Sequence, residues 1–415
     1  MTSGALARQT FASLSVRNYR VFFFGMLVSA TGTWMQSVAQ GWLVLQLTGS
    51  GTLVGLVTAA QFVPMLLGGV WGGVIADRFD KRHTLFASQA LLAFAAALLA
   101  VVTITDIVEV WMVFACALLT GCATVVDNPT RQAFVSELVG PDRVANAVAL
   151  NSAMFNAARI VGPAMAGVII LVAGTGACFG YNAVSYLAVI FSLTRMRPSE
   201  LHRGKPVARG RGQVRAGLRY AWANPDLRST ILLVAVVGTF ALNFTVLTPL
   251  LVEFTFDAGP GTLGVLTSFM GAGSLIGALV AAARAKPTPT LLAGAAGALG
   301  VVMIGVAVSP SLPVAALMLA LTGAATITFL STANTMLQLN SSTEMRGRVM
   351  SLYLLVFLGS TPIGGPIVGF VAETTNPRLG FVVGGVASLV GAVWAAGGLL
   401  RGRRIDDRHV ATATV

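Results

Sequence analysis

Charged residues are scarce in this chain. Only 10% of its 415 residues are Asp, Glu, Lys or Arg, whereas 55% are hydrophobic. A soluble domain carries roughly 25% charged residues, so a water-exposed surface could not be covered here. The deficit excludes an ordinary soluble globular protein.

Cysteine and histidine are also few. The three cysteines all fall in apolar stretches, and the three histidines, His83, His202 and His409, fall in polar ones. This distribution offers neither a disulfide framework nor the ligand spacing of a metal site. Paired carboxylates, a nucleophile with a base and a phosphate-binding glycine loop are missing too. We therefore expect no enzyme, no ATP-driven pump, no metal and no cofactor.

Long apolar blocks are what the chain has instead. Twelve of them approach the roughly 20 residues that cross a bilayer core as a helix, and they lack the alternation of barrel strands. The sequence therefore predicts an all-α polytopic membrane protein. The predicted spans lie near 21–46, 52–76, 84–105, 110–127, 144–172, 176–194, 230–252, 262–283, 290–308, 312–337, 349–371 and 379–400.

The net charge of +12 is distributed unevenly. With the N-terminus placed inside the cell, 25 of the 27 Lys and Arg residues fall in the termini and loops of the cytoplasmic side. Arg378 falls in an outside loop and Arg159 inside a predicted helix. The positive-inside rule thus predicts a multi-pass protein of the cell membrane with both termini cytoplasmic. The basic balance reflects topology and attraction to anionic lipids, and we expect no nucleic-acid partner.

A long polar stretch after the sixth span divides the chain. Residues 195–229 carry nine of the basic residues, and the part around 214–222 is predicted to form an amphipathic helix on the membrane surface. The predicted organisation is a six-helix bundle (1–194), a cytoplasmic linker (195–229), a second six-helix bundle (230–400) and a cytoplasmic tail (401–415). An offset of 203 residues superposes Arg143 on Arg346 and Gly162-Pro163 on Gly365-Pro366, which indicates an internal repeat.

The segment between the second and third spans carries the strongest local pattern. It resembles the loop signature of the major facilitator superfamily, in which glycine, aspartate and basic residues recur at fixed spacing, with matches at Gly73, Asp77, Arg78 and Arg82. Asp80 stands where the family has a second glycine. Gly73 would allow close helix packing, and Asp77 would cap the next helix. The resemblance implies a gate that latches the outward-facing state, and the alternative is a solvated turn with positive-inside residues.

The fourth span ends in charge. Thr120, Thr124, Asp127 and Arg131 lie on one helix face, and we expect Asp127 and Arg131 to lie near water, level with Asp77. The gating hypothesis includes both residues. The alternative is ordinary charge at a helix end.

The fifth span carries Gly162-Pro163 between small residues, which is similar to the signature of antiporters in this superfamily. Small-residue pairs of this kind permit close helix contacts, and they recur at Gly273, Gly277, Gly365, Pro366 and Gly369. Each one alone is explained by packing. Together they suit two bundles that rock against each other.

Other segments resemble the branch that contains the bacterial enterobactin exporter and macrolide-efflux proteins. They include Arg17-Asn-Tyr-Arg20 before the first span and Asn128-Pro-Thr-Arg131 after the fourth. The resemblance implies two pseudo-symmetric six-helix bundles, export of a small molecule such as a drug or siderophore, and protons as the coupling ion. We expect a monomer surrounded by lipid. A lipid flippase or an uptake permease of the same fold is the alternative.

The resemblance also implies a central cavity lined by the first, fourth, seventh and tenth spans. Polar residues there are candidate substrate ligands, and their alternative role is hydrogen bonding between helices. Arg159 in the fifth span would either face the cavity or brace the backbone near Gly162. No acidic residue is expected in mid-membrane, so the proton carrier stays open. The candidates are Thr33, Gln36, Gln40, Arg159, Thr239, Asn243, Thr326 and Asn334.

Overall fold

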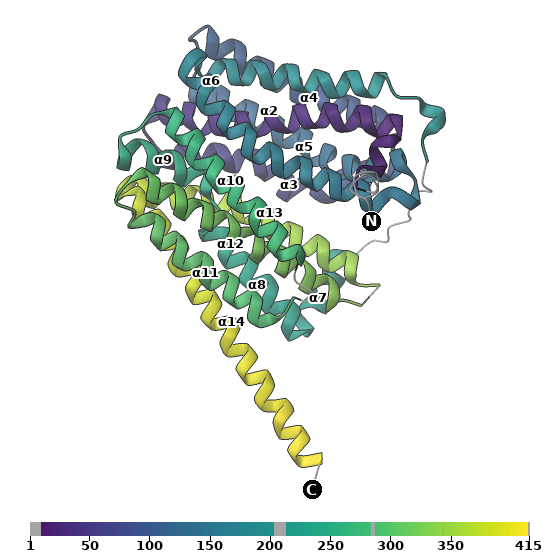
Figure 1. Ribbon diagram of the computed structural model, residues 1–415, viewed down its shortest axis with the longest axis vertical. Coiled ribbons are helices and arrows are strands. Elements are labelled where there is room, and N and C mark those ends of the chain that lie inside the picture. Colours follow the sequence, from purple (N-terminus) through teal and green to yellow (C-terminus); the bar gives the residue numbers. More distant parts are fainter. Residues whose placement is uncertain (1–9, 203–212, 284–286, 343, 414–415) are drawn as a thin grey trace, which may run out of the picture. The chain divides into compact units, whose positions relative to one another are not determined.

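The computed structural model describes residues 10–202, 213–283, 287–342 and 344–413, and every regular element in these ranges is a helix (Figure 1). This confirms the all-α prediction. Three short 3-10 helices are η1 (Ala12–Ser15), η2 (Pro141–Arg143) and η3 (Pro198–Glu200). The α-helices are α2 (Arg17–Thr48), α3 (Gly51–Arg78), α4 (Lys81–Ile104), α5 (Val110–Val139), α6 (Val144–Thr194), α7 (Gln213–Ala223), α8 (Pro225–Phe240), α9 (Phe244–Phe256), α10 (Pro260–Ala283), α11 (Pro289–Ala307), α12 (Leu312–Leu339), α13 (Arg346–Thr374) and α14 (Pro377–Ala413).

Eleven helical segments of the described chain are long and apolar enough to cross a membrane. One of them, Pro141–Thr194, contains two of the twelve predicted spans. The 51 residues of α6 would extend about 76 Å as one straight helix, more than twice a bilayer core of about 30 Å. Gly174, with φ 77° and ψ 174°, interrupts the helix between the two spans. Each of the twelve predicted spans therefore overlaps one of the eleven segments.

Side-chain caps mark the starts of several helices. The side chains of Ser50, Asp80 and Thr288 accept backbone hydrogen bonds at the starts of α3, α4 and α11. Asp80 caps α4, so the prediction that Asp77 would be the cap is wrong, because Asp77 still belongs to α3. The aspartate at the family's glycine position starts the next helix by bonding the N–H of His83.

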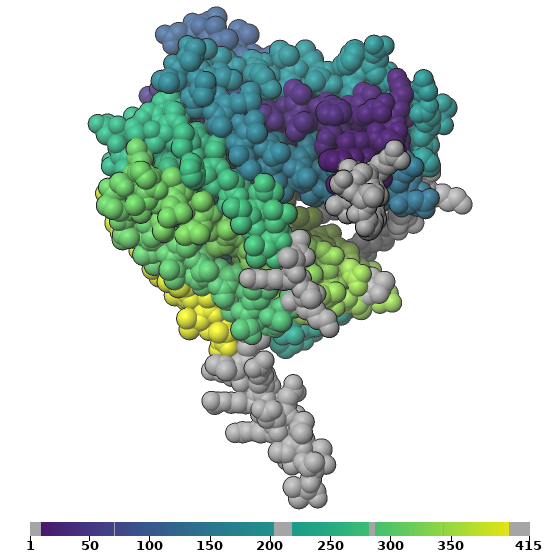
Figure 2. Space-filling model, in the orientation of Figure 1, coloured from purple at the N-terminus to yellow at the C-terminus, as the bar shows by residue number. Residues whose placement is uncertain are grey.

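The described chain forms two compact units, Met1–Arg209 with Ala258–Ser268, and Gly210–Asp257 with Phe269–Val415. In the first, α2 lies along α6, as the adjoining purple and teal surfaces of Figure 2 show. The sequence predicts residues 258–268 in the second bundle, but they belong to the first unit and pack on α6. The Ser268 hydroxyl donates to the Ile160 carbonyl at 3.0 Å, and the Cα atoms of Gly167 and Gly264 lie close together.

The predicted span 230–252 is interrupted in the second unit. Helix α8 ends at Phe240 and α9 begins at Phe244. The N–H of Leu242 bonds the carbonyl of Val237 at 3.2 Å, five residues back, and the Asn243 amide bonds the Thr239 carbonyl at 2.7 Å. The asparagine side chain replaces a helix hydrogen bond at this point and allows the break.

The sequence also predicts two segments outside the spans, an amphipathic helix and a C-terminal tail. The predicted helix around 214–222 is present as α7. It is held to the second unit by the backbone N–H of Ser342, which donates to the Tyr220 hydroxyl at 3.1 Å and lowers the pKa of that hydroxyl. The last predicted span ends at residue 400, but α14 continues into the predicted tail (401–415) as far as Ala413.

Large apolar side chains cover the helix exteriors. Trp71, Leu171 and Val172 are 67%, 73% and 80% exposed. Water would disfavour so much exposed apolar surface, whereas lipid tails accept it. The protein is a multi-pass membrane protein.

Candidate functional site

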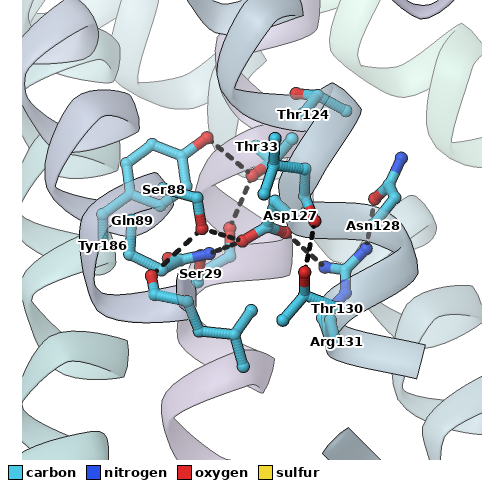
Figure 3. A network of polar contacts seen from close by, with 12 residues as sticks. Ser29, Thr33, Ser88, Gln89, Thr124, Asp127, Asn128, Thr130, Arg131 and Tyr186 are labelled. Atoms are coloured by element: carbon cyan, nitrogen blue, oxygen red, sulfur yellow. Dashed lines mark hydrogen bonds and ion pairs between the residues drawn. The ribbon is translucent and has the colours of Figure 1, made fainter. Parts of the chain in front are cut away.

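Asp127 lies inside α5 and is only 3% exposed. The prediction that it ends the fourth span close to water is wrong, because α5 continues to Val139. Two neighbouring residues of α4 bond its Oδ1 atom: the Ser88 hydroxyl at 2.9 Å and the Gln89 amide at 2.8 Å (Figure 3). The packing of α4 against α5 thus desolvates this carboxylate and supplies it with donors.

Arg131, one turn along α5, balances the charge of Asp127. Its Nη1 atom lies 3.9 Å from Asp127 Oδ2, and its Nη2 atom donates to Asn128 Oδ1 at 2.7 Å. The guanidinium also lies over the Phe155 ring of α6, 4.8 Å from its centroid. The Oε1 atom of Gln89 is buried without a hydrogen-bond partner. The cluster therefore places a carboxylate, a guanidinium and an acceptor without a partner side by side.

Polar residues of α2 and α6 adjoin this cluster. Thr33 Oγ1 and the Tyr186 hydroxyl share a hydrogen bond of 3.2 Å, and Thr33 also donates to the Ser29 carbonyl (Figure 3). Gln36 accepts a 2.6 Å hydrogen bond from Asn182. Gln36 therefore makes a hydrogen bond between helices, which is the alternative to a role as a substrate ligand. Gln40 is buried at 6% exposure.

The basic residues after α3 tie α4 to its neighbours. Lys81 forms a 2.6 Å ion pair with Glu137, and Arg82 Nε donates to the Leu193 carbonyl at 2.8 Å. Asp77 is half-buried and Arg78 is exposed at the end of α3. Helix α3 approaches α5 closely at Gly72, beside the predicted Gly73, where a Cβ would meet the Val125 carbonyl.

Ser88, Gln89, Asn182, Tyr186 and Glu137 were not selected from the sequence. Ser88 and Gln89 did carry a signal, since they are adjacent polar residues inside a predicted span. Only the packing of α4 on α5 shows that both meet one carboxylate.

Arg159 lies over the Trp34 ring of α2, 4.9 Å from its centroid. Within the described part of the chain, no hydrogen bond or ion pair joins its guanidinium to another residue. Gly162 provides the space, because a Cβ there would lie 2.6 Å from Trp34 Cβ and 2.8 Å from the Thr31 carbonyl. A central charge costs roughly 2.5–3.5 kcal/mol on insertion scales, and a desolvated cation–π contact returns about 2 kcal/mol. The stacking alone does not offset the cost.

The second unit separates its candidate ligands into local pairs. Asn243 bonds the Thr239 carbonyl, and Asn334 accepts from Gln338 one turn along α12. Thr326 Oγ1 is buried without a partner. These contacts stabilise helices and do not by themselves define a ligand site.

The packing glycines lie at helix crossings. A Cβ on Gly273 or Gly277 would meet the backbone carbonyls of Ala320 and Ala324 on α12. Gly364, one residue before the predicted Gly365-Pro366 pair, approaches the Thr239 carbonyl in the same way. Gly365 and Gly369 are buried on α13.

The described residues contain no group of three or more His, Cys, Asp or Glu side chains that could hold a metal ion. They contain apolar membrane helices with isolated polar clusters.

Similarity to known proteins identifies the family. Residues 8–410 match the transmembrane secretion effectors, and the chain belongs to this family of the major facilitator superfamily. It is 27% identical to the multidrug efflux pump Tap of Mycobacterium tuberculosis, covering 87% of this chain and 88% of that protein. The enterobactin exporter EntS of Shigella boydii is 23% identical, covering 86% of each chain. The staphyloferrin A transporter of Staphylococcus aureus is 25% identical over 63% of this chain and 66% of its own.

Solved structures agree on the fold. A bacterial homologue of the lysosomal transporter Spinster has a TM-score of 0.72 at 14% identity, covering 92% of this chain and 96% of that one. A D-xylose–proton symporter has a TM-score of 0.68 at 13% identity, covering 90% and 97%. The chain therefore has the major facilitator fold of two pseudo-symmetric six-helix bundles.

Proposed function

We propose that this protein is a secondary active exporter that moves a small molecule, such as a drug or siderophore, out of the cell by alternating access. The observation that supports export is the family match over residues 8–410, together with relatives named as efflux pumps and siderophore exporters. Broken and glycine-rich helices, as at α8–α9, are features of transporters in which one bundle moves against the other.

Proton antiport is the proposed energy source, with Asp127 as the carrier. A buried carboxylate near neutral donors can bind and release a proton as its surroundings change. Ser88 and Gln89 donate hydrogen bonds to this carboxylate, and the Arg131 guanidinium lies 3.9 Å from it. The proposed gate lies where α3 ends and α4 begins, and it consists of Gly73, Asp77, Arg78 and Arg82.

Transport by inverted membrane vesicles tests the function. Vesicles that contain the protein should accumulate a hydrophobic drug or a siderophore when a proton gradient is imposed, and collapsing the gradient should stop accumulation. Accumulation by right-side-out vesicles instead would identify an uptake permease. Movement of fluorescent phospholipid between leaflets, with no effect of the small molecules, would identify a flippase.

Cysteine labelling tests the proposed topology. In a background with the native cysteines replaced by alanine, Asp226→Cys should react with an impermeant maleimide only in inverted vesicles. Glu109→Cys, in the loop between α4 and α5, should react only in intact cells. Both sites are at exposed residues, so lack of access does not complicate the result. The reverse pattern would place the termini outside.

The gate is tested by Asp77→Asn. We expect the maximal transport rate to fall by about tenfold, while expression and melting temperature change little, because Asp77 lies at a helix end and not in the core. Arg78→Gln should act in the same direction. Unaltered kinetics in both variants would remove the gating role.

A further inference from the structure

Arginines in this protein bind carbonyls where they brace the fold. Arg378 donates to the Ala307 carbonyl at 2.8 Å and to the Ser309 carbonyl at 3.0 Å, joining the start of α14 to the end of α11. Arg82 and Arg346 likewise donate to the carbonyls of Leu193 and Gln338. A bracing arginine is thus recognised by its backbone acceptors.

Arg159 has the opposite pattern. It shares the stacking of Arg378, which lies over Phe256, but no carbonyl or carboxylate of a described residue accepts from it. Trp42 Nε1 and Gln89 Oε1 are fully enclosed by the described chain and have no partner. The nitrogens of Arg159 are not fully enclosed. Arg159 is therefore part-buried, and no described residue satisfies its donors.

The position of Arg159 limits which anion can reach it. It lies fifteen residues from Val144 and fifteen from the interruption at Gly174, about 22 Å from each along the helix. Lipid phosphates lie at the two membrane surfaces, outside a hydrocarbon core of about 30 Å. A small molecule that enters the protein can reach this depth.

We propose that Arg159 and Trp34 form a carboxylate-binding subsite for the transported molecule. The indole holds one face of the guanidinium, which fixes its plane and leaves the in-plane N–H groups free for a bidentate contact with a carboxylate. The substrate class is then organic carboxylates, an inference that rests on the proposed transport function. Bound substrate would supply the charge partner that the described chain does not.

Binding of 1-naphthoate and its neutral isostere 1-naphthamide tests the subsite. Both are titrated by calorimetry into purified full-length protein in phosphatidylcholine nanodiscs. We expect the wild type to bind naphthoate at least about tenfold more tightly than naphthamide. Arg159→Lys should remove most of that preference at an unchanged melting temperature, since lysine keeps the charge and loses the planar fork. Trp34→Leu should weaken naphthoate binding in the same direction.

Arg378→Lys is the matched control, because that arginine braces carbonyls. It should lower the melting temperature and leave the naphthoate preference intact. If Arg159→Lys behaves like this control, or if the wild type binds neither probe or both equally, the subsite is overturned. Competition by added phosphatidylglycerol that depends on Arg159 would identify a lipid phosphate as the anion and would also overturn it.

The proposed function can fail separately. Absence of proton-driven accumulation in inverted vesicles, with the naphthoate preference and its loss in Arg159→Lys intact, would refute antiport and retain the subsite. Proton-driven export together with naphthoate binding that does not depend on Arg159 would support antiport and overturn the subsite.

Discussion

Asp127→Asn is expected to abolish proton-driven transport. Asparagine fills the same space, and its Oδ1 can still accept from Ser88 and Gln89, but it cannot take up or release a proton. A positioned proton-transfer group contributes about 100-fold or more to a rate, so the gradient-driven rate should fall by at least about that factor. The measurement is drug or siderophore accumulation in inverted vesicles, with proton release followed by a pH-sensitive dye.

Glu137→Gln is the control on the same helix. Glu137 pairs with Lys81 at 2.6 Å, so its loss should cost some stability, and we expect transport to change by no more than about threefold because this pair is not the proposed proton carrier. Proton-coupled transport that persists in Asp127→Asn, or that is lost equally in Glu137→Gln, would exclude Asp127 as the carrier.

Gly273→Ala is expected to give the largest loss of stability. An added Cβ would lie 1.7 Å from the Ala320 carbonyl oxygen, and backbone cannot yield as a flexible side chain does. Forcing α10 and α12 apart should cost about 3 kcal/mol, which corresponds to a drop of about 5 °C in melting temperature for a chain of this size. Thermal unfolding of the purified protein in detergent measures it.

Gly297→Ala provides the comparison within the second unit. Its added Cβ would meet Ala392 Cβ at an ordinary 3.6 Å, so the higher helix propensity of alanine, about 1 kcal/mol, should leave the protein as stable or slightly more so. Equal melting temperatures for the two variants would show that the α10–α12 crossing adjusts without cost.

The sequence by itself determined the helical membrane fold. Length and composition of the apolar blocks predict each span because a bilayer core leaves the backbone no partners except within a helix. The α7 helix also follows a local amphipathic pattern, and the loop between α3 and α4 resembles its family through residues close in sequence. The candidate gate and the unusual Arg159 were identified for the same reason.

Only the tertiary structure decided what those residues contact. Asp127 was expected near water, but α5 extends to Val139 and α4 brings Ser88 and Gln89 to it. Gln36 bonds Asn182, 146 residues away. Arg159 stacks on Trp34, 125 residues earlier in the chain, without a backbone acceptor. Partners this distant depend on which helix faces meet, and in apolar helices that is set by small residues such as Gly162 at the crossings, since hydrophobicity is nearly equal on every side.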